Sequence, residues 1–112
     1  MPYFIGTGQY TREAMSGMMK SPENRRLSAE KLFERLGGKL HSYFVTFGEK
    51  DWLIIVEMPS VEAAAAATAI ATAGGGVCNL STTLAMTAEE AQKAFGLAGK
   101  EAAVFKSAGM KG

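Results

Sequence analysis

The chain has 112 residues, of which 47% are hydrophobic, and its 12 basic residues are balanced by 11 acidic ones. This length suits one domain with one core, and the near-zero net charge creates no field that would attract nucleic acid or an anionic membrane. Because no long apolar run and no signal-peptide pattern is present, we expect a cytoplasmic protein without a membrane span.

The N-terminal part of the chain predicts a strand followed by a helix. Residues 3–10 (YFIGTGQY) are β-prone and are interrupted by two glycines, as in a strand whose backbone passes close to another element. A serine, a proline and a glutamate at positions 21–23 are typical of a helix start. Apolar residues then recur at helical spacing up to Leu36, after which a Gly-Gly pair ends the helix.

The middle of the chain predicts an antiparallel hairpin. Residues 39–47 and 52–58 are rich in aromatic and β-branched side chains, and a short charged turn joins them. Neither segment alternates cleanly between apolar and polar residues, so both faces of the sheet must be covered. Helices of the same chain can cover only one face, and the second face therefore requires another partner.

The C-terminal part predicts a helix, a strand and a short helix. Ser60 caps an alanine-rich helix that runs to about residue 73, where three glycines end it. Residues 77–86 are typical of a last strand, and positions 87–90 form a capping box that opens a helix to about residue 95. We expect a domain over residues 1–96 and a loosely held C-terminal tail over residues 97–112.

The order of these elements predicts an α+β fold. A βαββαβ order with an extra C-terminal helix gives a ferredoxin-like sandwich with a four-stranded antiparallel sheet and two helices on one face. The opposite face would expose several hundred square ångströms of apolar surface, roughly the limit for monomers. A second copy is the simplest cover, so we expect a homodimer whose two sheets form a dimeric α/β barrel, alone or within a higher oligomer.

Several short segments resemble the GYD domain family, a small bacterial family within the dimeric α/β-barrel group. These segments are Ser-Pro-Glu at 21–23, Leu-Gly-Gly-Lys-Leu at 36–40, the hairpin turn at 48–51 and Ile-Val-Glu at 55–57. The resemblance extends over about residues 2–95, but Lys50 stands where the family's tyrosine is expected, so no role of that tyrosine carries over. The resemblance implies the fold and dimerisation, and no particular reaction. Related barrels include cofactor-free monooxygenases, dehydratases and ligand-sensing modules.

Three residues of the hairpin are the candidate catalytic groups: His41, Tyr43 and Asp51. Because His41 and Tyr43 have the same parity, we expect both on one sheet face, where a neutral imidazole beside a phenol can act as a general base. Asp51 can orient the histidine or cap the turn through its own backbone. A role at the strand rim or in packing is favoured for His41, since no second catalytic group is fixed by spacing. A structural role in the turn is favoured for Asp51.

Three other residues are candidates for ligand binding: Tyr10, Trp52 and Cys78. Trp52 offers a flat surface with one donor, which suits a planar ligand, although core packing is the commoner role. No basic neighbour in the sequence activates Cys78, and one cysteine with one histidine excludes structural zinc. No metal ion and no cofactor is predicted. The methionines at 15, 18 and 19 can line an adaptable pocket, but gap filling is favoured.

Three functions remain open from the sequence. The first, which we favour, is a homodimeric protein that binds a small apolar or aromatic ligand in a cleft in or beside the barrel. The second is a cofactor-free enzyme of monooxygenase, dehydratase or isomerase type with His41 as general base. The third is a structural assembly module. All three include self-association, and none includes nucleic acid or a membrane as a partner.

Overall fold

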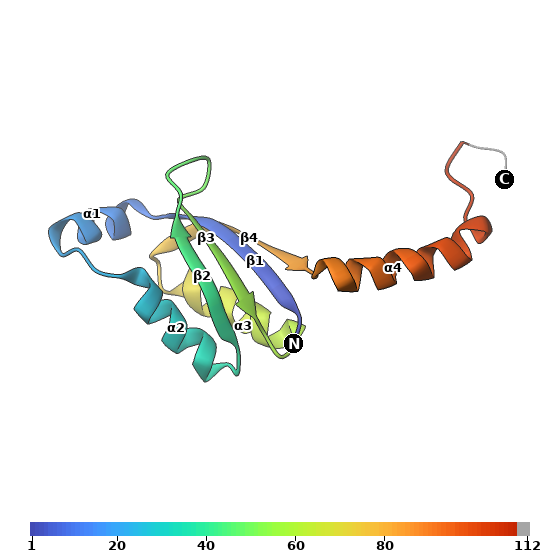
Figure 1. The fold of residues 1–112 in the computed structure, drawn as a ribbon. Coiled ribbons are helices and arrows are strands. Elements are labelled where there is room, and N and C mark those ends of the chain that lie inside the picture. Colours follow the sequence, from blue (N-terminus) through green and yellow to red (C-terminus); the bar gives the residue numbers. More distant parts are fainter. Residues whose placement is uncertain (110–112) are drawn as a thin grey trace.

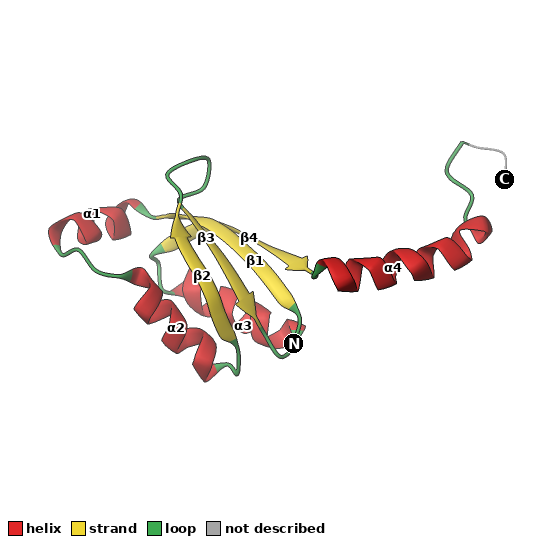
Figure 2. Ribbon diagram, viewed as in Figure 1, coloured by secondary structure: helices red, strands yellow, loops and turns green. Residues whose placement is uncertain are grey.

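A computed structural model describes residues 1–109. Its elements in chain order are β1 (Tyr3–Tyr10), α1 (Arg12–Lys20), α2 (Arg25–Arg35), β2 (Lys39–Val45), β3 (Trp52–Glu57), α3 (Val61–Ala73), β4 (Val77–Ala85), α4 (Ala88–Glu101) and the short 3-10 helix η1 (Ala102–Val104). The four strands form one antiparallel sheet in the order β2-β3-β1-β4, with α2 and α3 on one face (Figures 1 and 2). This is the predicted ferredoxin-like arrangement, in which β3 lies between β1 and β2.

The connection from β1 to β2 contains two helices, where the sequence predicted one. The side chains of Thr11 and Asn24 cap α1 and α2 by accepting backbone hydrogen bonds. The predicted helix start at Ser21 was wrong, because Ser21 is the residue that ends α1. The short α1 escaped prediction because it contains Gly17, a weak helix former, among three methionines.

One sheet face holds the hydrophobic core. Phe4, Trp52 and Val56 point toward α2 and α3, and none of these three side chains is more than 6% exposed. A Cβ at Gly8 would overlap the indole ring of Trp52, and one at Gly6 would press on Ile54. The two β1 glycines therefore provide space for β3 side chains, which confirms the predicted close approach.

The opposite face of the sheet carries no helix in the described part of the chain, and we call it the outer face. Its apolar members are Ile5, Phe44, Leu53 and Ile55. Ile5 pairs directly with Ile55, and Phe44 with Leu53, so these side chains lie side by side. Phe44 is 58% exposed, whereas the other three are half-buried. The outer face is the surface for which the sequence required an external cover.

The C-terminal helix α4 projects from the end of β4 as an arm (Figure 1). The predicted capping box is confirmed, since Thr87 N donates to Glu90 Oε1 at 2.8 Å and Glu90 N donates to Thr87 Oγ1 at 3.1 Å. The predicted end near residue 95 was wrong: the helix continues to Glu101, because alanine, leucine and lysine surround its two glycines. The predicted tail is therefore helical over residues 97–104, and residues 110–112 lie outside the described residues. No helix within residues 1–109 has the length and hydropathy needed to cross a bilayer.

Candidate functional site

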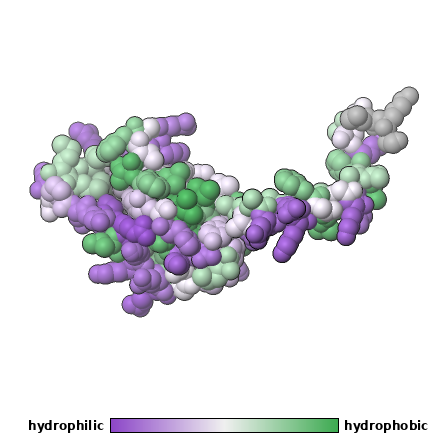
Figure 3. Space-filling model, viewed as in Figure 1, coloured by the Kyte–Doolittle hydropathy of each residue, from purple (hydrophilic) through white to green (hydrophobic). Residues whose placement is uncertain are grey.

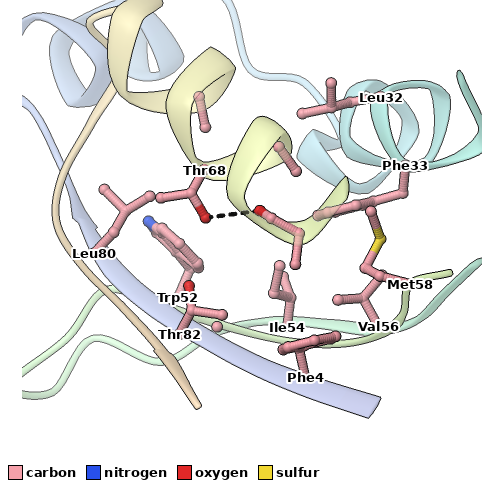
Figure 4. Close-up of a pocket in the computed structure, with 14 residues that line it drawn as sticks. Phe4, Leu32, Phe33, Trp52, Ile54, Val56, Met58, Thr68, Leu80 and Thr82 are labelled. Atoms are coloured by element: carbon pink, nitrogen blue, oxygen red, sulfur yellow. Dashed lines mark hydrogen bonds between the residues drawn. The ribbon is translucent and has the colours of Figure 1, made fainter. Parts of the chain in front are cut away.

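A cleft opens between the sheet and the helices that cover it, and we call it the inter-helix cleft. Its deep part is an apolar cavity of about 70 Å³ between α3 and the strands, with Phe4, Trp52 and Ile54 in its walls (Figure 4). Its wide part, about 270 Å³, lies between α2 and α3 and shares Trp52 and Ile54 with the deep part. An open mouth of about 500 Å³ adjoins the wide part through Arg25 and Tyr43.

Small side chains of α3 leave the space that forms the deep part. The α3 residues that line it are Ala64, Ala67, Thr68 and Ala71. Across the cavity, β1 contributes Gly6. A helix with larger residues at these positions would fill the cavity, so the alanine-rich sequence of α3 explains why the core contains a gap.

Trp52 forms the floor of the deep part and brings an unsatisfied donor to it. Its Nε1 is the buried side-chain nitrogen or oxygen within residues 1–109 that has no hydrogen-bond partner. Figure 4 shows the indole nitrogen on the side that faces Thr68 and Leu80, while the hydroxyl of Thr68 donates to the carbonyl oxygen of Ala64 at 3.1 Å. Leaving a buried N–H unpaired costs about 1–3 kcal/mol. An acceptor placed in this cavity would recover that energy.

Two tyrosines stand at the boundary between the mouth and the wide part. The hydroxyl oxygens of Tyr10 and Tyr43 are 2.6 Å apart, so one donates a hydrogen bond to the other. Burial raises the pKa of Tyr10, and the hydrogen bond with Tyr43 raises it further. The phenol of Tyr10 therefore stays neutral at physiological pH, and the hydrogen-bonded pair offers donor and acceptor positions to a ligand. Arg25 adds a positive charge nearby, paired with Glu23 at 2.9 Å.

The predicted placement of His41 and Tyr43 on one face was wrong. Strand β2 has a bulge at His41, because the residues on either side of it pair with neighbouring residues of β3. Beyond the bulge the alternation is shifted, so Tyr43 faces the helices and His41 lies on the outer face. Arg26 of α2 donates to the carbonyl oxygens of His41 at 3.3 Å and of Leu40 at 3.1 Å, which stabilises the bulge.

His41 has partners on the outer face that the sequence did not indicate. Its Nε2 lies 3.0 Å from Glu57 Oε2, and its ring centroid lies 5.4 Å from that of Tyr3. The hydrogen bond from His41 lowers the pKa of Glu57, and the charge of Glu57 raises the pKa of Tyr3. A carboxylate bonded to an imidazole can orient it as a general base. Glu57 could be identified as the partner of His41 only from the pairing of β2 with β3, since 16 positions separate the two residues in the sequence.

Asp51 and Cys78 lie away from the inter-helix cleft. The Asp51 carboxylate accepts a hydrogen bond from the Tyr10 backbone at 2.9 Å, and its own backbone N–H donates to the Gly8 carbonyl at 2.8 Å. Asp51 thus ties the hairpin turn to the end of β1 through both its carboxylate and its backbone. Cys78 pairs with Gln9 and is half-exposed. Of the six predicted site residues, the structure brings Tyr10, Tyr43 and Trp52 together along the cleft.

The part of the chain that the structure describes contains no group of three or more His, Cys, Asp or Glu side chains arranged to hold a metal ion. What the cleft offers is an apolar volume with one unpaired donor at its base, two phenols at its boundary and the guanidinium groups of Arg25 and Arg26 at its mouth. This set of groups can bind and orient an apolar molecule through one or two hydrogen bonds.

Comparisons with known proteins place the chain in a family. Residues 4–95 match the GYD domain, as the resemblance in the sequence indicated. No curated protein matches the chain. Among solved structures, the chain is similar to a crystal structure of a MhuD mutant with two manganese protoporphyrin IX bound per active site. The identity is 17%, the match covers 79% of this chain and 95% of that chain, and the TM-score is 0.43.

Proposed function

We propose that this chain, which belongs to the GYD domain family, binds a small apolar ligand in the inter-helix cleft and works as a homodimer. The observation that carries the proposal is the unpaired Nε1 of Trp52 at the base of an apolar cavity. Burying that donor is unfavourable in the empty protein, and a ligand with a matching acceptor removes the penalty. Binding sites of this kind combine apolar walls with few polar groups that fix orientation.

The dimensions of the cleft favour a ligand of one or two rings. The wide part, at about 270 Å³, is close to the lower end of ligand sites, roughly 300 Å³. The deep part, at about 70 Å³, has room for a small terminal group. A flat ring system between α2 and α3 would therefore place one substituent beside Trp52.

The acceptor that reaches Trp52 should be neutral. A carboxylate in the deep part would lose its hydration among apolar walls, and the cost of burying such a charge exceeds the gain from one hydrogen bond. A ketone or quinone oxygen accepts the indole hydrogen without that cost. An anionic group on the same ligand would lie at the mouth, where Arg25 is half-exposed.

The outer face supports the homodimeric part of the proposal. Ile5, Leu53 and Ile55 would be left in contact with water in a monomer, and with Phe44 they form one contiguous patch. A second copy would cover this patch with an identical one about a two-fold axis. Figure 3 shows hydrophobic residues at the surface over the strands and along the arm.

The test uses the fact that Trp52 is the single tryptophan of the chain. Its indole N–H gives one signal in a ¹H–¹⁵N correlation spectrum, and that signal moves downfield when the N–H gains an acceptor. We expect 2-acetylnaphthalene to cause a saturable downfield shift, and 2-ethylnaphthalene, which lacks the oxygen, to bind about 3- to 10-fold more weakly without that shift.

Two variants of α3 provide matched controls for the binding test. Ala71 lines both the deep and the wide part, whereas Ala69 is exposed. Ala71→Leu should abolish binding of both naphthalenes, and Ala69→Leu should leave it unchanged. Binding that survives Ala71→Leu, or no binding of either probe by the wild-type protein, would refute the cleft as the site.

A cofactor-free enzyme is the second candidate, and one observation favours it. His41 is bonded to Glu57 and lies beside Tyr3, which is an arrangement suited to proton abstraction. This candidate ranks second because the inter-helix cleft lies on the other side of the sheet. Its substrate would have to bind on the outer face, where the second copy is proposed to pack.

A further inference from the structure

The arm formed by α4 has an apolar stripe that nothing covers within residues 1–109. At 100° per residue, one side of the helix collects Ala88, Ala91, Ala94, Phe95, Ala98 and Ala102. Phe95 stands in the middle of this stripe and is 74% exposed. The opposite side carries charged residues and Leu97. No residue of α4 is buried, so the stripe lies in water in a single copy.

The position of the arm prevents it from packing on its own sheet. Only Met86 and Thr87 separate β4 from α4, and Thr87 is fixed by both bonds of the capping box. The arm therefore continues away from the end of β4, and the chain measures 61 Å along its longest axis against 32 and 22 Å along the others (Figure 1). An isolated helix of 14 residues is marginally stable in water, so α4 needs a surface to pack on.

We propose that α4 docks by its apolar stripe on a second copy of this chain, so that two copies exchange their C-terminal arms. This inference rests on the homodimer proposed above and adds to it the element that holds the two copies together. The root of the arm is continuous with the outer face, because Ala85 pairs with Tyr3 of that face immediately before the arm begins. A copy seated on the outer face would meet the arm of its partner.

The area of contact favours a dimer with exchanged arms over a dimer that is held together by its sheets alone. Four strands of about eight residues cover roughly 500 Å² per copy, whereas a stable specific interface buries about 800 Å² per partner. One side of a helix of this length adds roughly 200 Å² where it docks. In an exchanged dimer each copy gives one arm and receives another, which raises the area to roughly 900 Å² per partner.

The reach of the arm also fits. A helix of 14 residues is about 21 Å long, and four strands side by side span about 19 Å. The arm can therefore cross the width of the partner's domain.

The test compares two glutamate substitutions on opposite sides of α4 in the full chain. Phe95→Glu places a charge in the stripe, and Leu97→Glu places the same charge about 200° away around the helix. Sedimentation equilibrium should show the dimer dissociation constant raised about 100-fold or more by Phe95→Glu, because a symmetric dimer loses two such contacts. Leu97→Glu should change it less than about 3-fold. Both variants should keep the native Trp52 emission, since α4 makes no core contact.

The outcomes separate the arm from the dimer itself. A wild-type dimer that Phe95→Glu leaves intact would refute arm exchange and leave the pairing of sheets standing. A wild-type protein that is monomeric at 100 µM would refute both. Equal weakening by the two variants would refute the assignment of the stripe as the docking side. Hydrogen exchange gives an independent reading, because the amides of α4 should be protected in the dimer and exchange rapidly in Phe95→Glu.

Discussion

The two faces of the sheet differ in what the chain itself provides to cover them. On the helix side, Phe4, Trp52 and Val56 are nearly inaccessible, and glycines and alanines adjust the space around them. On the outer face, Ile5 and Ile55 are apolar but only half-buried. The hydrophobic effect acts on both sets equally, yet only the helix side is satisfied within one copy. One face therefore folds the domain, and the other face is available for association.

This difference explains the continuous apolar run of β3. Alternate residues of a strand point to opposite faces, so Trp52 and Ile54 enter the core while Leu53 and Ile55 lie on the outer face. A strand with one wet face would alternate between apolar and polar residues. The absence of alternation in β3 is the pattern expected of a strand whose two faces are both to be covered.

Charges placed at adjacent positions of β3 would break the two faces separately, with the largest effect expected. Ile54→Glu puts a carboxylate at a partly buried position that packs against the core, and it should destabilise the fold by about 3 kcal/mol, because apolar neighbours cannot compensate the lost hydration of the charge. Ile55→Glu puts the same group on the outer face and should dissociate the proposed dimer while the monomer stays folded. Thermal denaturation and sedimentation measure the two effects.

The pair of variants also tests the assignment of the faces. An Ile55→Glu protein that remains dimeric would show that the outer face is not where copies meet. An Ile54→Glu protein with unchanged stability would show that the register of β3 differs from the one described. Each variant serves as the other's control, since both introduce one charge at neighbouring positions in the same strand.

Much of the fold could be predicted because its signals are local. The Ser60 cap, the capping box at Thr87 and the hairpin between β2 and β3 each depend on residues a few positions apart. The sheet order then followed from the handedness of βαβ connections. The helix α1 was missed, since a short segment with a serine and a glycine gives a weak periodic signal.

The candidate site was harder to predict because it depends on register. A bulge at His41 moves every later side chain of β2 to the other face, and nothing in the local sequence marks that position as an extra residue. The hydrogen bond between Tyr10 and Tyr43 follows from that shift, whereas the contact of His41 with Glu57 depends on the register of β2 against β3 before the bulge. Residue types were sufficient to select Tyr10 and Trp52, but only the structure shows that Tyr43 joins them.

Filling the space under Trp52 would disturb the helix side alone, with an intermediate effect. A Cβ at Gly8 would overlap the indole ring, so Gly8→Ala should lower stability by about 1–3 kcal/mol and change the emission of Trp52. Gly17→Ala is the control, because Gly17 lies in α1 and no atom lies within 4 Å of the added carbon. This variant should be more stable than the wild-type protein by about 0.5–1 kcal/mol. Chemical denaturation of both variants measures the difference. Equal stability of Gly8→Ala and wild type would mean that the helix side is less tightly packed than described.

The smallest expected effect concerns the polar part of the outer face, where His41 lowers the pKa of Glu57 below its usual 4.5. A carboxyl whose pKa is lower in the folded state stabilises the protein above the unfolded pKa, and that stabilisation is lost as pH falls through the folded pKa. The wild-type protein should therefore lose stability below about pH 4.5, and Glu57→Gln should flatten that part of the curve. His41→Ala should flatten it equally, since the hydrogen bond is the main cause of the shift. The same measurements with Ile55→Glu added to each protein compare a monomeric background with the assembled one. If a second copy covers the outer face, stability should fall less steeply with decreasing pH in the monomeric background. The reason is that water weakens an exposed hydrogen bond. Identical slopes in the two backgrounds would mean that Glu57 stays in water in the assembled protein.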